Sequence, residues 1–345
     1  MRPRADRTTG ACADGAADGV IGGLLIGRQE ALALLAEAER DPWPLLAAAN
    51  RVRRHFRGRC VHLCSIAPVK LGRCSEDCHW CAQSAHWATG LAPRGMAAIG
   101  DLLRSAREAA AWGAGHFGLV TSGARLSDDE FEAVLQAGRT IRSDVGIDVC
   151  SSLGALTPER ALRLREAGFH RYNHNLETSS RHFGTVCTTH AWGDRARTAR
   201  AALAAGLELC SGAIFGIGET DEDRVDVALA IRDLGAHVVP LNFLHPIPGT
   251  PLGQAKPLPP LKILSIVAMF RLMMPDRTIK LAGGREHNLR SLQSLMFMAG
   301  ADACLIGNYL TTPGRPADQD IEMIRDLGLQ PDGPAQRPAG GPENA

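Results

Sequence analysis

The chain has 345 residues, a mass of 36.8 kDa and a formal net charge of +1. This balance, without a run of like charge, argues against a nucleic-acid partner and favours a small ligand. No stretch of about 18 apolar residues occurs, so we expect no membrane-spanning segment. Ten cysteines are too few for a disulfide scaffold, and no apolar signal segment opens the sequence, so we expect a cytoplasmic protein.

The composition predicts one large domain between two disordered segments. Residues 1–21 are rich in Ala, Gly, Asp and Arg without apolar periodicity, and residues 331–345 are rich in Pro and Gly. Neither segment can bury enough apolar surface to offset the entropy lost on ordering. The domain expected at 22–330 has the length of a single barrel of alternating strands and helices.

Within this domain, short apolar or β-branched runs alternate with longer Ala-, Leu- and Arg-rich segments of helical period, several of which end near a Gly. Eight runs are expected to be strands: 60–65, 116–123, 146–154, 171–177, 207–216, 237–244, 278–284 and 303–308. The alternation predicts an α/β fold, a closed (β/α)8 TIM-type parallel barrel with its chemistry at the carboxyl ends of the strands. The alternative is an open, doubly wound sheet.

The loop after the first predicted strand, RCSEDCHWCAQ at 73–83, places Cys74, Cys78 and Cys81 within eight residues. Thiolate sulfur suits iron-sulfur clusters and zinc. A zinc knuckle would take a fourth ligand from a nearby His or Cys, and a disulfide pair is a further alternative. The third reading is a 4Fe-4S cluster with one iron left open for a reacting ligand.

The spacing C-x3-C-x2-C with Trp80 before the last cysteine resembles the signature of the radical S-adenosylmethionine (SAM) enzymes. In that superfamily the amino and carboxylate groups of SAM bind the open iron, and an electron from the cluster splits SAM into methionine and a 5'-deoxyadenosyl radical. The resemblance implies that Cys74, Cys78 and Cys81 hold a 4Fe-4S cluster and that Trp80 lies at the SAM site.

Six runs together resemble the biotin synthase family over about residues 45–330. They are 74–84, 172–179, 210–220, 241–252, 283–286 and 297–314. Members of this family insert sulfur between two unactivated carbons of dethiobiotin, which requires a radical cofactor in a shielded cavity. The resemblance implies a radical SAM sulfurtransferase that takes dethiobiotin as substrate, receives electrons from a flavodoxin or ferredoxin, and forms a homodimer.

The family holds a second cluster, of the 2Fe-2S type, as its sulfur donor on three cysteines and an arginine. Cys150 and Cys210 match two of these cysteines, and alternation along a strand lets each aim a thiol into the barrel. Gly118 stands in place of the third cysteine and Lys280 in place of the arginine. The resemblance therefore implies a 2Fe-2S or other auxiliary cluster on Cys150, Cys210 and Lys280, or none, with Cys187 as a conceivable substitute ligand.

Further polar and small residues match the ligand contacts of the family. Those for SAM are Asn175, Glu177, Gly216 and Gly218, and those for the substrate are Asn173 and Asn242. Glu177 replaces an Asp of the family, and His190 stands where an arginine usually lies near the SAM carboxylate. The structural alternative is that these side chains satisfy backbone groups at strand ends.

Two rival functions stay open on the sequence. The departures at Gly118, Lys280 and His190 favour a paralogue that cleaves SAM without inserting sulfur and acts on another small substrate. A non-catalytic metal-binding or regulatory protein on the same barrel is the second rival. We expect Cys60, Cys64 and Cys304 to lie in the core, because free cysteines are usually buried.

Overall fold

The computed structural model describes residues 8–332, and the predictions for 1–7 and 333–345 lie outside this range. Eight parallel strands follow one another around a barrel, and β9 pairs with β1 to close it. They are β1 (Cys60–Lys70), β2 (His116–Thr121), β3 (Asp148–Ser152), β4 (Arg171–Asn173), β5 (Glu208–Cys210), β7 (Val238–Phe243), β8 (Thr278–Leu281) and β9 (Ala303–Leu305). All eight predicted runs are confirmed as strands, and the open-sheet alternative is wrong.

The fifth predicted run is broken into β5 and β6 (Ala213–Phe215), and β6 pairs with β7. A Cβ atom at Gly212, within the break, would lie 1.8 Å from the carbonyl oxygen of Pro240. Only glycine therefore fits where the two chain segments cross this closely.

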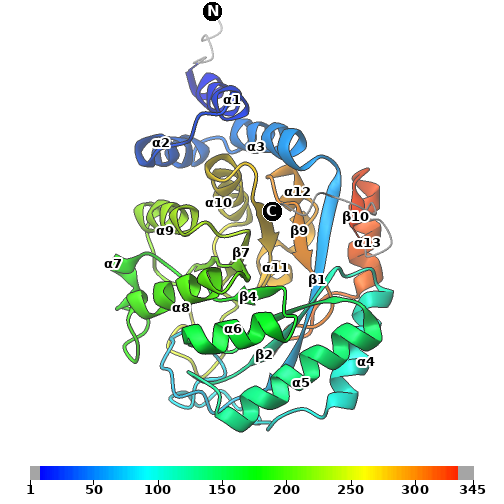
Figure 1. Cartoon of the computed structure of the whole chain (residues 1–345). Helices are drawn as coiled ribbons and strands as arrows, with labels where there is room; N and C mark the ends of the chain where they lie inside the picture. Colours follow the sequence, from blue (N-terminus) through cyan, green and yellow to red (C-terminus); the bar gives the residue numbers. More distant parts are fainter. Residues whose placement is uncertain (1–7, 333–345) are drawn as a thin grey trace, which may run out of the picture.

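The helices cover the outside of the barrel and alternate with the strands (Figure 1). The long ones are α4 (Ile99–Ala111), α5 (Asp128–Val145), α6 (Pro158–Glu166), α8 (Trp192–Ala204), α9 (Asp221–Leu234), α10 (Pro260–Met273) and α13 (Ala317–Asp326). The short ones are α7 (Ser180–Phe183), α11 (Arg285–Leu289), the 3-10 turn η1 (Arg290–Leu292) and α12 (Leu295–Met298). Helix α5 begins at a capping box of Ser127 and Glu130 and ends at Gly146 in the left-handed conformation, as its sequence favours.

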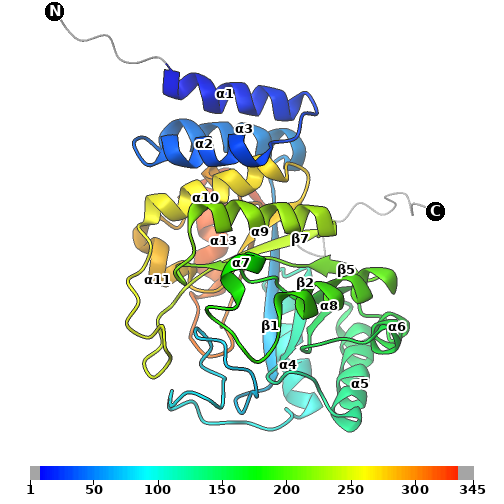
Figure 2. The ribbon, with the colours of Figure 1, turned by 90° about the vertical axis from the view of Figure 1, so that its left-hand side faces the viewer.

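Three N-terminal helices, α1 (Thr8–Ile21), α2 (Arg28–Ala38) and α3 (Trp43–Arg57), stack at one end of the molecule, with α1 outermost (Figures 1 and 2). The prediction of a disordered segment is thus wrong for residues 8–21. Ala13, Ala16, Ala17 and Val20 are buried, and α1 packs on α3. Small side chains at helical spacing allow this close packing, although they give the sequence little apolar signal.

The predicted tail begins two residues too early. Strand β10 (Gln330–Asp332) pairs in parallel with the start of β1, with Cys60 opposite Gln330. His62 Nδ1 lies 2.8 Å from Asp332 Oδ2 and supports this pairing. Backbone bonds to an existing strand order residues whose side chains alone would not.

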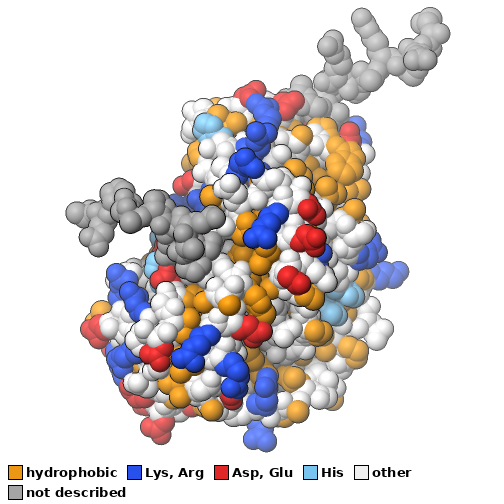
Figure 3. All heavy atoms as spheres, turned by 90° about the vertical axis from the view of Figure 1, so that its right-hand side faces the viewer, with side chains coloured by type: hydrophobic (Ala, Val, Ile, Leu, Met, Phe, Trp, Pro, Cys, Tyr) orange, Lys and Arg blue, Asp and Glu red, His pale blue; other side chains and the backbone are white. Residues whose placement is uncertain are grey.

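None of the helices in residues 8–332 is long and apolar enough to cross a membrane. On the face in Figure 3, basic and acidic side chains are intermixed with apolar ones instead of forming one continuous basic area.

Candidate active site

The loop that follows β1 brings the three predicted cluster cysteines together. A backbone bond from Cys74 N to Gln83 O (2.9 Å) folds the loop back on itself. A bond from Cys81 N to Cys78 O (3.1 Å) closes the turn between these two residues, and Trp87 Nε1 donates to Cys78 O at 3.0 Å. All three cysteines are half-buried at the carboxyl end of β1, where barrel enzymes carry their chemistry.

The spacing of the loop's donor atoms argues against a zinc knuckle. A tetrahedral zinc ion with bonds of about 2.0–2.3 Å holds its donors within about 4 Å of one another. In the described part of the chain, two groups of three potential donors lie within 4.8 Å of one another, and neither is the set of Cys74, Cys78 and Cys81. The nine cysteines whose side chains are described are all free, which argues against the disulfide alternative. An iron-sulfur cluster, which holds its thiolates further apart than one ion does, fits this loop.

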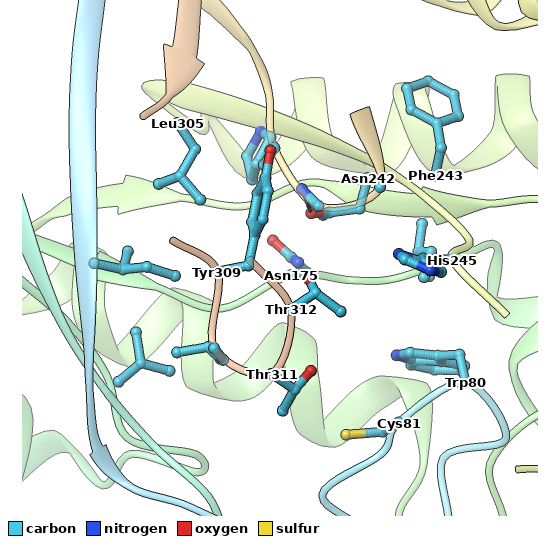
Figure 4. Close-up of a pocket in the computed structure, with 18 of the residues that line it drawn as sticks. Trp80, Cys81, Asn175, Asn242, Phe243, His245, Leu305, Tyr309, Thr311 and Thr312 are labelled. Atoms are coloured by element: carbon cyan, nitrogen blue, oxygen red, sulfur yellow. Dashed lines mark hydrogen bonds between the residues drawn. The ribbon is translucent and has the colours of Figure 1, made fainter. Parts of the chain in front are cut away.

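Two adjoining cavities lie inside the barrel and share Trp80, Cys81 and Glu177 as walls. The first, the lumen cavity, measures about 340 Å³, and Figure 4 shows Trp80, Cys81, Asn175 and Asn242 among its walls. Asn173, Cys210 and Lys280 also line it. The second, the loop cavity, measures about 290 Å³ and is lined by the three loop cysteines, His190 and Arg195, among others. Together they have the size of a site for one cofactor and one small substrate.

A buried ion pair separates the two cavities. Arg195 Nη2 donates to Glu177 Oε1 at 2.9 Å, and Asn175 Nδ2 donates to Glu177 Oε2 at 3.4 Å. Burial raises the pKa of Glu177, which Arg195 opposes. Glu177 also has a φ of 70°, a conformation that side chains other than glycine rarely adopt and that is concentrated at functional sites. Glu177 lines both cavities and Asn175 lines the lumen cavity, while His190 lies beside Arg195 at 3.1 Å. Their contact with SAM stays a prediction.

The two asparagines predicted to bind substrate differ in their partners. The Asn242 amide is used by the backbone, because its Nδ2 donates to Ala213 O (3.1 Å) and its Oδ1 accepts from Gly283 N (2.9 Å). Asn173 Oδ1 is buried and has no hydrogen-bond partner in residues 8–332. A buried amide oxygen without a partner costs about 1–3 kcal/mol. Asn173 lines the lumen cavity, and its binding of a ligand there stays a prediction.

Gly216 and Gly218, predicted to seat the SAM adenine, lie in a turn with φ values of 88° and 98°. The turn encloses the buried carboxylate of Glu219, which accepts from Gly216 N (3.0 Å) and Ile217 N (2.8 Å). Neither glycine lines the two cavities, whereas Ile214 of the same run lines the lumen cavity. Their contact with adenine stays a prediction.

The three predicted auxiliary-site residues are buried in the barrel interior: Cys150 on β3, Cys210 on β5 and Lys280 on β8. Burial raises the pKa of Cys150 to about 12. Burial alone would lower the pKa of Lys280, but the Cys210 and Cys64 thiols raise it above its ordinary value. As an ammonium, Lys280 can donate hydrogen bonds to these thiols but cannot coordinate iron.

A third thiol lies in this interior, and sequence reasoning missed it. Lys280 Nζ donates to Cys64 Sγ at 3.4 Å and to Cys210 Sγ at 3.8 Å. We had expected Cys60 and Cys64 in the core, but Cys60 is exposed and half-buried Cys64 lies on the lumen side of β1. The alternation of side chains along β1 could have predicted this position, because Cys64 lies on the same face of the strand as His62 and Ile66, and Ile66 lines the lumen cavity. Cys304 is buried in the core as expected.

The structure also locates the two remaining positions considered for the auxiliary cluster, Gly118 and Cys187. A Cβ atom at Gly118 would lie 3.0 Å from Ile66 Cγ2, so the position of the family's third cysteine is filled by an isoleucine methyl. Cys187 Sγ lies 3.7 Å from Cys78 Sγ and 3.4 Å from His190 Nδ1. The idea that Cys187 replaces the missing auxiliary cysteine is wrong, because this thiol belongs to the surroundings of the cluster loop.

Arg171 adds a second buried cation beside the auxiliary thiols. It pairs in register with Cys150, and its Nε donates to Glu208 Oε2 at 2.9 Å. Burial opposes its charge, but the Cys150 thiol and Glu208 raise its pKa. With Lys280, Arg171 gives the interior between the thiols a positive potential, which suits an anionic group such as a thiolate-bound cluster.

A closed parallel barrel with a three-cysteine loop after its first strand defines a class, the radical SAM barrel enzymes. The profile of the Radical SAM superfamily matches residues 69–231, and that of the Biotin and Thiamin Synthesis associated domain matches residues 240–330. Methylornithine synthase shares the fold with a TM-score of 0.78 at 20% identity, over 92% of this chain and 97% of that one. The FeFe-hydrogenase maturase HydG from Carboxydothermus hydrogenoformans also has a TM-score of 0.78, at 18% identity, over 92% and 79%.

Two curated relatives are much more similar in sequence. The biotin synthase of Geobacter sulfurreducens is 49% identical over 314 residues, covering 91% of this chain and 95% of its own. The biotin synthase of Heliobacterium modesticaldum is 48% identical over 307 residues, covering 89% and 94%. The chain belongs to the biotin synthase family.

Proposed function

We propose that this chain converts dethiobiotin into biotin, with dethiobiotin in the lumen cavity and SAM at the cluster loop. The observation that carries the proposal is one continuous cavity that joins Trp80 and Cys81 to the unpartnered Asn173 and to Cys210 and Lys280. A substrate there lies between the site of radical formation and the auxiliary thiols. The family resemblance and the relatives' names support the same reaction.

The residues present fit a 4Fe-4S cluster and SAM, since three half-buried thiols face a cavity that also holds the charges of Glu177 and Arg195. When bound, this pair supplies a 5'-deoxyadenosyl radical that can take hydrogen from unactivated carbon. Arg195 orients the Glu177 carboxylate, and Trp80 forms a wall shared by both cavities. These contacts hold the cofactor side of the site fixed relative to the lumen.

Asn173 Oδ1 would accept a hydrogen bond from an N–H of the ureido ring of the substrate. Asn242 would act indirectly, because its amide joins β6, β7 and the turn after β8 into one wall. Apolar side chains, including Ile66, Val120 and Leu305, line the same cavity and exclude water from the reacting carbons. A dry cavity protects a carbon radical from quenching.

We further propose that the auxiliary centre is held by Cys64, Cys150 and Cys210, as a 2Fe-2S or another iron-sulfur cluster. Lys280 and Arg171 would neutralise its negative charge as hydrogen-bond donors and cations instead of as iron ligands. This arrangement replaces a thiol on β2 by one on β1 and leaves the space beside Gly118 to Ile66.

The proposed partners and location come from the family resemblance. A small electron carrier, flavodoxin or ferredoxin, would reduce the SAM-site cluster, and the protein would work as a homodimer in the cytoplasm. These three assignments stay proposals on the family resemblance alone.

The decisive experiment is an anaerobic turnover of reconstituted protein with SAM, dithionite and dethiobiotin, reading 5'-deoxyadenosine and biotin by mass spectrometry. Biotin supports the proposal. 5'-Deoxyadenosine without biotin or its thiol intermediate would select the paralogue that has lost sulfur insertion. If neither product forms although the cluster is present, a non-catalytic metal-binding or regulatory role becomes the better reading.

The auxiliary ligands are tested by Cys64→Ser against Cys60→Ser, an exposed thiol on the same strand. We expect Cys64→Ser to lose the Mössbauer signal of the auxiliary centre and biotin formation, while SAM cleavage continues. Cys60→Ser should leave all three unchanged. Full auxiliary iron in Cys64→Ser would refute the assignment of Cys64.

A further inference from the structure

The amino-terminal ends of the barrel strands carry a row of titratable side chains that the proposed reaction does not use. Asp148 and Glu208 are the first residues of β3 and β5, and His170 and His237 come directly before β4 and β7. His116 begins β2. This end of a barrel usually serves stability and is filled by packing. A dense polar cluster there is a reason to look for a second site.

All of these side chains except Asp148 border a cavity of about 400 Å³, here named the floor pocket, which is also lined by His62 and Arg171, among others. Cys64 and Lys280 also line it. Lys280 lines the lumen cavity as well, so the floor pocket and the lumen cavity meet at the auxiliary thiols from opposite ends of the barrel.

Three of these strand ends converge on one point. One ring nitrogen from each of His116 and His170 and one carboxylate oxygen of Asp148 all lie within 4.8 Å of one another. The register explains this, because His116 pairs with Asp148 across β2 and β3, and His170 N donates to Val149 O at 2.9 Å. All three residues are half-buried. His116 Nε2 and Asp148 Oδ2 are 3.9 Å apart. Donors around an ion with tetrahedral bonds of about 2.0–2.1 Å lie about 3.4 Å apart, so these side chains need to close by roughly 0.5–1.4 Å.

We propose that His116, Asp148 and His170 form a binding site for a divalent transition-metal ion, with Fe²⁺ as the biological ion. Two imidazoles and one carboxylate leave open coordination positions and suit Fe²⁺ better than the hard cations Mg²⁺ and Ca²⁺. Glu208 Oε2 lies 3.2 Å from His170 Nε2. This contact would orient the imidazole for metal binding through its other nitrogen, Nδ1.

The position of the site suits a role in supplying iron to the auxiliary centre. This role rests on the proposed function. A cluster that donates its sulfur must be rebuilt, and from the carboxyl ends its cysteines lie behind the SAM and substrate cavities. The floor pocket reaches Cys64 from the other end. The metal site would hold iron there for reloading of the auxiliary centre.

The first test is equilibrium dialysis of the reconstituted holoenzyme against Co²⁺, with bound cobalt and iron counted by elemental mass spectrometry. The clusters occupy the loop and auxiliary thiols, and Glu76, Cys187 and His190 form the other closely spaced donor group, so the proposed site is counted by difference between variants. We expect Asp148→Asn/His170→Gln to bind about one Co²⁺ per chain less than the wild type, or to bind that ion at least roughly 10- to 100-fold more weakly. His55→Gln, which removes an exposed imidazole on α3, is the matched control and should bind as the wild type does.

Equal cobalt binding in the wild type and in Asp148→Asn/His170→Gln would overturn the site, as would loss of cobalt in His55→Gln. Retained SAM cleavage shows that the double variant is folded, and the single variant His116→Gln, expected to weaken cobalt binding likewise, repeats the test should the double variant not fold. If the holoenzyme cleaves SAM but makes no biotin, the proposed function fails while the cobalt count still decides this inference.

The second test follows reloading. After turnover has consumed the auxiliary centre, ⁵⁷Fe²⁺ and sulfide are supplied and the auxiliary Mössbauer signal is followed over time. We expect slower recovery in Asp148→Asn/His170→Gln than in the wild type or His55→Gln. Equal recovery rates would overturn the loading role.

Discussion

Replacing Gly118 by cysteine would restore a thiol at the family's position on β2, and we expect it to destabilise this chain. A Cβ atom there would lie 3.0 Å from Ile66 Cγ2 and 3.7 Å from Asn173 Nδ2. Ile66 is held by β1, whose pairing with β2 places it directly opposite Gly118. The methyl group cannot move away without disturbing the lumen wall.

The magnitude follows from two opposing effects. Overpacking a filled interior typically costs about 1–3 kcal/mol. Replacing a glycine in a strand by itself raises the free energy of unfolding by about 0.5–1 kcal/mol, because the unfolded chain loses conformational freedom. We therefore expect Gly118→Cys to lower the free energy of unfolding by about 0.5–2 kcal/mol, and the Asn173 side chain to be pushed from its position toward the substrate.

The assay is urea denaturation of the apoprotein, followed by far-ultraviolet circular dichroism, in a double-mutant cycle with Ile66→Ala. Because the alanine removes the clashing methyl, Gly118→Cys should cost less in the Ile66→Ala background, with a coupling of about 1 kcal/mol. An unchanged or raised stability of Gly118→Cys, or identical costs in both backgrounds, would refute the packing argument.

Three further predictions concern buried charges. Asp302→Asn should lower the free energy of unfolding by about 3–5 kcal/mol in urea denaturation, because it leaves the fully buried Arg271 without its carboxylate partner. A loss below 1 kcal/mol would contradict this. Arg195→Lys should weaken SAM binding roughly 10- to 100-fold in equilibrium dialysis, because charged hydrogen bonds of about 1.5–3 kcal/mol are lost; an unchanged dissociation constant would show that the ion pair has no role in the SAM site. Burial opposes the charge of Glu208, but His170 and Arg171 hold its pKa well below the usual range. Its stabilisation is therefore present above about pH 4.3 and is lost as the pH falls below that value. Glu208→Gln should flatten the acid limb of the stability profile, and an unchanged limb would contradict the assignment.

The sequence predicted the barrel because each strand is a short apolar run set apart by a helical segment. It missed α1, because that helix packs through Ala13, Ala16 and Ala17, whose small side chains resemble the composition of a disordered segment. Strand β10 was missed because its order comes from backbone bonds to β1, which no side-chain pattern reveals.

The cysteine loop and the positions of Asn173 and Glu177 were predictable, because they follow strands whose carboxyl ends meet. Hydrogen-bond partners were not. The Asn242 amide bonds to backbone groups of other strands, whereas the Asn173 amide oxygen has no partner in residues 8–332, and only the folded chain distinguishes the two. Cys64 was missed because its nearest ionic partner, Lys280, is 216 residues away.

The closure of the barrel also sets an order of events during synthesis. β1 pairs with β9 and β10 as well as with β2, so its final partners are among the last described residues to leave the ribosome. At roughly 5–20 residues per second, β1 waits on the order of ten seconds or more for them. During that time the sheet has an open edge, and Cys64 is reachable from the side that the finished barrel encloses. Until β9 and β10 pair with β1, a small ligand can therefore reach Cys64 without passing through the cavities of the finished barrel.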